Sequence, residues 1–311
     1  MADIHTSAYD ALSLLSVDEI IEAPELFEAA IKELIEGEQA YKLIFNTFNT
    51  TESVVKYKEE VAPELDDGLQ IVPEFSEIPV TDPYDDREEK FISIEPHAVG
   101  IRVSQQQRKA NKSNEVQREV MARARTIRKG NGLAALAALK AADIEEYRVE
   151  TPWDVSSADV REDIGLVTDL IMGATDKNGN QFGYEPDVFW ANPVTINRAK
   201  RNETVRKDFI GDMASQNPLF KKIGQNPLIG GYLQVVPDSS IPVGEAYIGV
   251  EGAGGYEAQN GAPTTTAFYE EGGQSGLGGP TMSWRSDYVH FRGLYLPGTK
   301  SIIKLTNLAT A

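Results

Sequence analysis

A long acidic and proline-rich stretch separates two segments that have the pattern of strands. Residues 61–86, VAPELDDGLQIVPEFSEIPVTDPYDD, contain eight carboxylates, four prolines and no lysine or arginine. Eight unpaired carboxylates would be very costly to bury, so this stretch does not belong in a core. It is either a disordered linker or an exposed excursion that lies on some other surface.

The flanking segments favour an excursion. Residues 52–60 and 87–103 alternate with the period of strands, and Val99, Ile101 and Val103 face one way. If the two segments pair as one long hairpin, each arm with its share of the tip has about 20 residues and reaches roughly 60 Å at about 3.3 Å per residue. Such a ribbon is not stable alone in water. No other part of the chain offers an obvious platform for it.

The next segment is the most basic part of the chain. Nine Lys or Arg residues lie between Arg102 and Lys129, against Glu115 and Glu119, and apolar residues recur at helical spacing. KGNG at 129–132 predicts an interruption, with a second, small-residue helix from Leu133. The cationic face is either a nucleic-acid site or a solvated face that pairs with acids of the same protein, and we favour the second interpretation.

Several shorter elements are also predicted. SVDE at 16–19 has capping-box spacing, a helix with an apolar stripe begins at Pro24, and residues before 16 are a weakly patterned arm. Helices are predicted for residues 160–174 and 193–209, a short strand for 187–193, and further strands for 230–236 and 246–250. Residues 251–280 have the composition of a loop, and two strands around Pro297 to Thr299 close the sequence.

Composition excludes several classes of protein. A net charge of −18 argues against a general nucleic-acid coat or a protein that binds anionic membranes. The absence of cysteine excludes disulfides and thiolate chemistry. No apolar run of membrane-spanning length occurs, so we expect neither a membrane span nor a signal peptide.

The sequence contains no convincing catalytic or metal-binding set. His5, His97 and His290 lie far apart, and none has metal-binding spacing. The glycines near Ser275 do not form a nucleophile elbow, those after Glu251 do not form a dinucleotide motif, and DKNGN at 176–180 is better explained as a tight turn than as a calcium loop. We therefore predict no catalytic residue, metal or cofactor.

The order of these parts resembles the major capsid proteins of tailed bacteriophages, which share the Hong Kong 97-type fold. The resemblance rests on the extended loop and basic helix (52–129), on YEPDVFWANPVTINRAK, and on the closing SWRSDYVHFRGLYLPGTKSIIKLTNL. It implies an α+β fold with five parts: an N-terminal arm with a short amphipathic helix (1–51), an extended β-hairpin or E-loop (52–103), a peripheral domain with a long spine helix (104–159), a mixed α/β axial domain (160–280), and strands that return to the peripheral domain (281–311).

In this family the E-loop lies across a neighbouring subunit, which would supply the missing platform. We therefore predict an inter-subunit contact between acidic loop residues and the basic helix with its flank. The acidic residues are Glu64, Asp66, Asp67, Glu74, Glu77, Asp82, Asp85 and Asp86. The basic residues are Arg102, Arg108, Lys109, Lys112, Arg118, Arg123, Arg125 and Arg128.

The resemblance also implies a function. Such a chain is not an enzyme: it assembles with itself into pentamers and hexamers of an icosahedral head that encloses double-stranded DNA without sequence-specific binding. Only about 50 residues precede the hairpin, which implies a separate scaffolding protein. A portal and a decoration protein are further expected partners, with assembly in the host cytoplasm and the virion as destination. The alternatives are an encapsulin-like cellular shell and, more remotely, an acidic hydrolase or a carbohydrate-binding protein.

Overall fold

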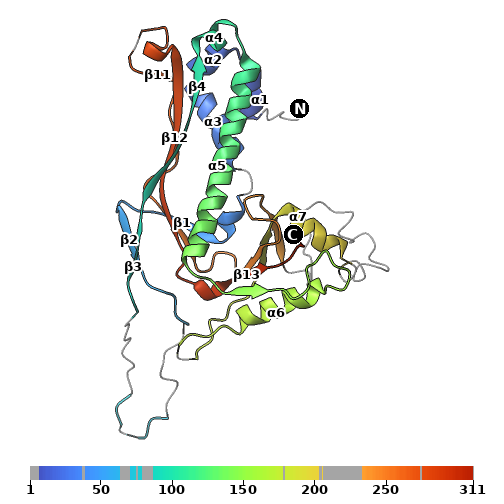
Figure 1. The fold of residues 1–311 in the computed structure, drawn as a ribbon. Coiled ribbons are helices and arrows are strands. Elements are labelled where there is room, and N and C mark those ends of the chain that lie inside the picture. Colours follow the sequence, from blue (N-terminus) through green and yellow to red (C-terminus); the bar gives the residue numbers. More distant parts are fainter. Residues whose placement is uncertain are drawn as a thin grey trace, which may run out of the picture.

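A computed structural model describes residues 7–36, 39–63, 71–74, 76–78, 87–177, 179–202, 205, 233–273 and 275–310. A long helix and a long strand run together through one end of the molecule, and a second sheet with two helices lies beside their other end (Figure 1). A short two-stranded sheet continues from the lower part of the long strand. The molecule is therefore elongated, and its described residues form three separate sheets.

The N-terminal segment is helical and packs on the long helix. It forms α1 (Ala8–Ser13), α2 (Val17–Glu22), α3 (Pro24–Glu36) and the 3-10 helix η1 (Ala40–Leu43). The predicted capping box is confirmed, because the Ser16 and Glu19 side chains each accept from the other's backbone N–H. The predicted apolar stripe of α3 is also confirmed, with Phe27 and Ile31 buried in one cluster with residues of the long helix. The expectation of a weakly structured arm is wrong from residue 8 onward, because Leu12 of α1 is fully buried in the same cluster.

The long helix is continuous. After α4 (Gln105–Lys109), α5 runs from Ser113 to Ala141 without a break at KGNG, so the predicted interruption is wrong. Packing explains two of these four residues. Asn131 is buried and donates to Gln39 Oε1 at 2.7 Å, and Gly132 is so close to Ser240 that a Cβ there would lie 2.8 Å from the Ser240 Cβ. Tertiary contacts therefore override the local tendency of Asn and Gly to end a helix.

The first sheet has six strands and contains the longest pairing in the molecule. Its strands are β1 (Phe45–Asn49), β4 (Glu95–Ser104), β9 (Gly255–Gln259), β10 (Thr264–Thr265), β11 (Tyr269–Glu270) and β12 (Ser283–Tyr295), with the 3-10 helix η4 (Gly279–Thr281) just before β12. β12 pairs antiparallel with β4 from Ser283↔Ser104 to Arg292↔Glu95. Residues 251–280 are therefore not simply a loop, and β9 to β11 belong to this sheet.

The predicted long hairpin is only partly correct. β2 (Val54–Tyr57) and β3 (Lys90–Ser93) pair antiparallel, from Val54↔Ser93 to Tyr57↔Lys90. From Glu95 onward, however, the second arm pairs with β12 and not with residues 52–60. Part of the platform for the second arm is thus supplied by the same chain, by β12.

The second sheet has five strands, in the order β5 (Glu146–Arg148), β13 (Ile302–Thr306), β8 (Ala246–Gly249), β6 (Val188–Ala191) and β7 (Gln234–Pro237). The 3-10 helix η5 (Thr299–Ser301) precedes β13. Helices α6 (Val160–Met172) and α7 (Pro193–Arg201) accompany this sheet, as predicted for these segments. β13 pairs with β5, which lies in the predicted peripheral segment 104–159, and Ile302 is buried in one cluster with Ala135 and Leu139 of α5. Ile303 and Leu305 are buried in the core of the second sheet, so the return of residues 281–311 to the peripheral domain stays a prediction.

Candidate assembly surfaces

The base of the hairpin is fixed to the first sheet. The Tyr57 ring lies 4.5 Å from the Tyr295 ring of β12, between centroids, and Val55 packs in the same small apolar cluster. An ion pair between Lys90 Nζ and Glu59 Oε1, at 2.5 Å, joins the two arms just beyond the paired strands. The direction in which the excursion leaves the subunit is therefore set by packing.

The described part of the tip is exposed. Residues 71–74 and 76–78 lie at the end of the excursion, away from both sheets (Figure 1). Ile71 is fully exposed, and Ile78, Glu74 and Glu77 are also exposed. The other six predicted acidic contact residues lie outside the described residues: Glu64, Asp66, Asp67, Asp82, Asp85 and Asp86. The described tip therefore presents both apolar and acidic side chains to its surroundings.

Three of the predicted basic residues have partners within their own subunit. Arg102 Nη2 lies 2.7 Å from Glu271 Oε1, and Lys112 Nζ lies 2.8 Å from Glu115 Oε1. Arg108 pairs with Asp18 and also lies over the Trp284 ring, 4.6 Å from its centroid. These cations stabilise the subunit itself, as the favoured interpretation of the basic segment expected.

Arg123 is buried between α5 and β12. Its Nη1 donates to Ser286 Oγ at 3.0 Å, and burial lowers the pKa of its guanidinium to about 10. The prediction that Arg123 lies on a contact surface is therefore wrong for the folded subunit. One signal in the sequence could have shown this. Arg123 lies between Val120 and Ile127 on the apolar edge of the helix, but the prediction considered only its charge.

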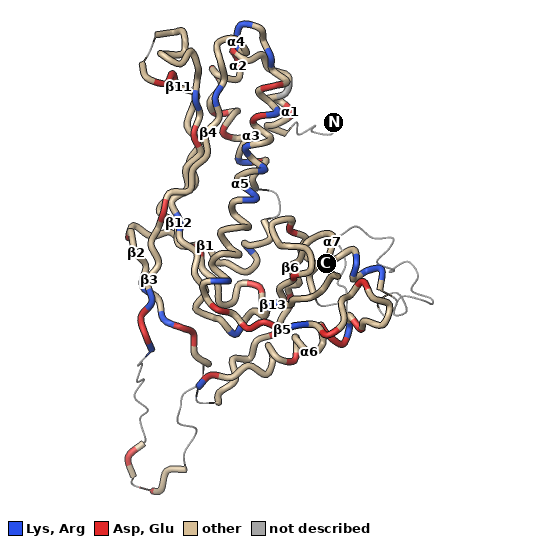
Figure 2. The backbone as a smooth tube through the Cα atoms, viewed as in Figure 1, with Lys and Arg blue, Asp and Glu red and all other residues tan. Residues whose placement is uncertain are grey.

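The remaining four predicted basic residues, Lys109, Arg118, Arg125 and Arg128, are exposed. None of them forms an ion pair with another residue in the described ranges. Figure 2 shows that blue segments gather on α4 and on the upper part of α5. These four cations are therefore available for contacts outside the described subunit, and the predicted contact with loop carboxylates stays a prediction.

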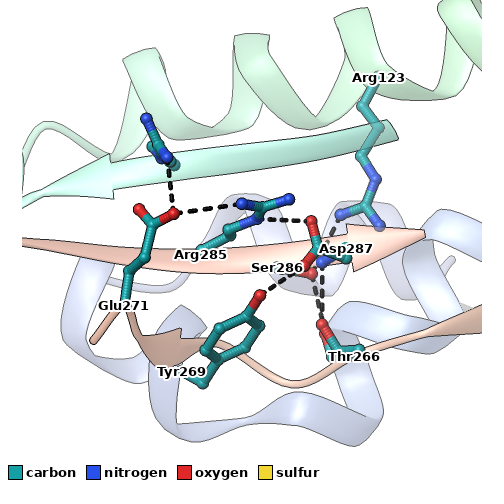
Figure 3. Close-up of polar contacts among 8 residues, drawn as sticks. Arg123, Thr266, Tyr269, Glu271, Arg285, Ser286 and Asp287 are labelled. Atoms are coloured by element: carbon teal, nitrogen blue, oxygen red, sulfur yellow. Dashed lines mark hydrogen bonds and ion pairs between the residues drawn. The ribbon is translucent and has the colours of Figure 1, made fainter. Parts of the chain in front are cut away.

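A polar network holds the end of the first sheet together (Figure 3). Glu271 Oε1 accepts from both Arg102 and Arg285, and these bonds keep the pKa of the Glu271 carboxyl below its usual value. Arg285 Nε also donates to Asp287 Oδ1 at 2.8 Å, and Asp287 Oδ2 accepts from the Tyr269 hydroxyl at 2.5 Å. The network joins β4, β11 and β12, so the loop that leads into β12 is fixed at its base.

A second polar cluster lies deep in the same sheet and was not predicted. Glu257 of β9 accepts from Arg292 Nη1 on one carboxylate oxygen, at 3.1 Å. The other oxygen accepts from the hydroxyls of Tyr41 at 3.3 Å and Thr47 at 3.1 Å. The one signal in the sequence is that Arg292 alternates in phase with Trp284 and Tyr288 along a strand, which puts it on the buried face.

Two of the three histidines meet in the same region. His290 of β12 and His97 of β4 are opposite each other in register, and His290 Nε2 lies 3.1 Å from Gln259 Oε1. Burial, with the nearby Arg292 charge, lowers the pKa of His290 to about 4. Sequence reasoning treated these histidines as ordinary and separate, and His5 lies outside the described residues.

The described ranges contain neither a candidate metal site nor a candidate membrane-spanning helix. No group of three or more His, Asp or Glu side chains in them could hold a metal ion. No helix in them is long and apolar enough to cross a membrane.

Comparison with known proteins decides the family. A family model described as phage capsid protein matches residues 87–299 of the chain. The chain belongs to the phage capsid protein family. No curated protein matches the sequence. The capsid protein is therefore a structural protein of the virion and not an enzyme, and the family match favours a phage capsid over a cellular shell.

Solved structures show that the fold of this capsid protein is of the Hong Kong 97 type, as the sequence predicted. A structure from Gordonia phage Cozz has a TM-score of 0.59 at 12% identity and covers 88% of this chain and 87% of its own. A structure from Mycobacterium phage Bobi has a TM-score of 0.54 at 15% identity and covers 90% of this chain and 97% of its own. The structure of a virus-like particle from Pyrococcus furiosus has a TM-score of 0.55 at 12% identity and covers 91% of this chain and 99% of its own. At these identities the likeness concerns the fold alone.

Proposed function

We propose that this major capsid protein assembles into pentamers and hexamers that close into an icosahedral head around double-stranded DNA. The observation that carries the proposal is the hairpin, which is fixed at its base by Tyr57 and Tyr295 but exposes Ile71 and Ile78 at its described tip. A segment of this kind gains little by itself and much from a second subunit. The shell confines DNA by closure, so an acidic chain fits this role.

The acidic loop of one subunit runs close to the basic helix of another. We base this contact on the eight predicted loop carboxylates and on the four exposed cations Lys109, Arg118, Arg125 and Arg128. One exposed pair contributes only about 0–1 kcal/mol. Many such pairs, repeated around closed rings, set the register of neighbouring subunits and guide their encounter. The loop prolines reduce the conformational freedom that docking must remove.

Other partners complete the proposal. A separate scaffolding protein guides assembly in the host cytoplasm, a portal occupies one vertex, and DNA enters without sequence-specific contacts. A decoration protein can bind the outer surface. These partners follow from the family resemblance, and each can be tested by copurification with the assembled particle.

The first test is electron microscopy with light scattering of the purified protein, alone and with its candidate scaffold. Closed shells, tubes, or discrete pentamers and hexamers support the proposal, and a monomer under both conditions contradicts it. The second test replaces Asp66 and Asp67 by Lys, alone and together with Arg125→Glu and Arg128→Glu. We expect the loop variant to lose assembly and the combined variant to regain it. Unchanged assembly of the loop variant would mean that the tip makes no such contact.

A further inference from the structure

The lower half of α5 exposes an apolar stripe with a lysine edge. Leu133 is 48% exposed, although it lies two turns from the C-terminal end of a long helix, and Ala137 one turn later is also exposed. Lys129 and Lys140 flank them, both exposed and without an ion pair in the described part of the chain. At about 100° per residue these positions share one helix face. We call Lys129, Gly130, Leu133, Ala137 and Lys140 the α5 stripe.

Helix α6 exposes a matching stripe with an acidic edge. Its inner face, including Ile164 and Val167, is fully buried in the second core. Its outer face carries Leu166 and Leu170, which are 42% and 45% exposed, one turn apart. Glu162 and Asp169 lie beside them, exposed and without an ion pair among the described residues. We call Glu162, Leu166, Asp169 and Leu170 the α6 stripe.

Gly130 provides an independent sign that something approaches the α5 stripe. A glycine inside a helix destabilises it relative to alanine. Gly132 is explained by its contact with Ser240, but a Cβ at Gly130 would meet no atom within 4 Å. Nothing in the described subunit requires a glycine at position 130. A second helix that packs closely on this face would require it, since small residues allow helix axes to approach.

We propose that the α6 stripe of one subunit packs on the α5 stripe of a second copy of this chain. The two stripes are complementary in charge and alike in their apolar centres, which is why a second copy is the occupant. Viewed from outside with its N-terminus up, each helix carries its charged residues on the same side of its leucines. If two such faces meet in parallel, the lysines of one helix and the carboxylates of the other lie on opposite sides of the contact. If they meet antiparallel, the lysines and the carboxylates lie on the same side and face each other. In that arrangement Leu133 and Leu166 meet near the centre, and Lys140 lies close to Glu162.

The contact is heterologous, because each copy uses its α6 stripe to bind one neighbour and its α5 stripe to bind another. Heterologous contacts close into rings when the rotation between copies divides a circle. This inference rests on the proposed self-assembly, but the surface it names does not include the hairpin and lies on α5 towards the C-terminal side of Arg118, Arg125 and Arg128.

The absence of cysteine in the natural chain allows a direct test by cross-linking. A disulfide forms only when two Cα atoms come within roughly 4.4–6.8 Å. The variant that carries both Leu133→Cys and Leu166→Cys should form inter-chain disulfides in assembled particles, seen as a ladder or a closed ring on a non-reducing gel. Each single-cysteine variant should remain monomeric on that gel. The matched control pairs Leu166→Cys with Leu14→Cys, since Leu14 is also exposed but lies on neither stripe.

A charge exchange supplies the second test. Lys140→Glu and Glu162→Lys should each slow assembly by roughly tenfold, and the double variant should restore it, because attraction across the edge is recovered. Glu28→Lys, an exposed carboxylate on α3, is the control and should leave assembly unchanged.

Two results would overturn the inference while the proposed function stands. One is a double-cysteine variant that assembles normally but forms no disulfide between positions 133 and 166 of neighbouring chains. The other is a pair of single charge exchanges that leave the assembly rate unchanged. Failure of the wild-type chain to assemble would overturn both the inference and the proposed function.

Discussion

Arg292 and Glu257 form an ion pair inside the first sheet, with Nη1 and Oε1 3.1 Å apart and the two side chains only 2% and 1% exposed. The carboxylate also accepts from Tyr41 and Thr47, so three donors offset the loss of its hydration. Arg292 Nε has no partner in the described structure. The pair therefore joins β12, β9, β1 and the 3-10 helix η1 at one buried point.

Removal of one partner of this pair should strongly destabilise the subunit. Glu257→Gln leaves a buried guanidinium without its counter-charge, and we expect the free energy of unfolding to fall by about 3–5 kcal/mol. Glu257→Leu combined with Arg292→Met removes both charges and should cost much less. Urea denaturation of the unassembled subunit measures both. Equal losses in the single and double variants would show that the charges themselves matter little.

Subunit stability should depend on pH through His290. Its pKa is lowered to about 4 in the folded state, against 6.5 for an unperturbed histidine. The unfolded chain therefore binds the proton first as pH falls. The free energy of unfolding should decrease from about pH 6.5 down to about pH 4, by up to roughly 3 kcal/mol, and this contribution is fully present above that window. Thermal unfolding of the wild type and of His290→Gln across this window measures the difference. Parallel pH curves for the two proteins would contradict the assignment.

The two glycines of KGNG should respond oppositely to alanine. Gly132→Ala places a Cβ against Ser240 and should lower the free energy of unfolding by about 1–3 kcal/mol. Gly130→Ala meets open space in the same helix and should raise it by about 0.5–1 kcal/mol. Each variant is the control for the other, because helix propensity changes equally in both. Stabilisation by both substitutions would mean that Ser240 moves aside without cost.

Assembly should slow as salt rises. The screening length falls from about 10 Å at 0.1 M to about 3 Å at 1 M ionic strength, which weakens attraction between loop carboxylates and exposed cations. The triple variant Arg118→Gln, Arg125→Gln, Arg128→Gln should assemble more slowly at low salt and with a shallower salt dependence. Time-resolved light scattering measures both, with Arg148→Gln, exposed on β5, as the control. If the assembly rate of the triple variant depended on salt as steeply as that of the wild type, these cations would not contribute to assembly.

Sequence reasoning was accurate where local chemistry decides the structure. The capping box at Ser16 and Glu19, the stripe of α3 and the strand at Val188 to Ala191 all follow from spacing within a few residues. It failed where distant partners decide. The pairing of β4 with β12 joins segments almost two hundred residues apart, and no local pattern distinguishes it from pairing with β2.

The candidate surfaces show the same division. Charge patterns found the exposed cations Arg118, Arg125 and Arg128, but could not separate them from Arg123, which β12 covers. The Arg292–Glu257 pair was missed because an isolated arginine in a strand looks like a surface residue until the strand has a partner on that face. Helix continuity at KGNG depended in the same way on Asn131 and on Ser240, far along the chain.

The position of β12 and β13 near the end of the sequence has a consequence during protein synthesis. β12 is the partner of β4, β9, β10 and β11, and β13 lies between β5 and β8 in the other sheet. Neither sheet can be completed until residues 283–306 have left the ribosome, long after α5 and β4 have emerged. The strand edges that pair with β12 and β13 therefore stay open until this last segment emerges. A chain that stops before residue 283 lacks a central strand of the six-stranded sheet and of the five-stranded sheet, and cannot complete either of them.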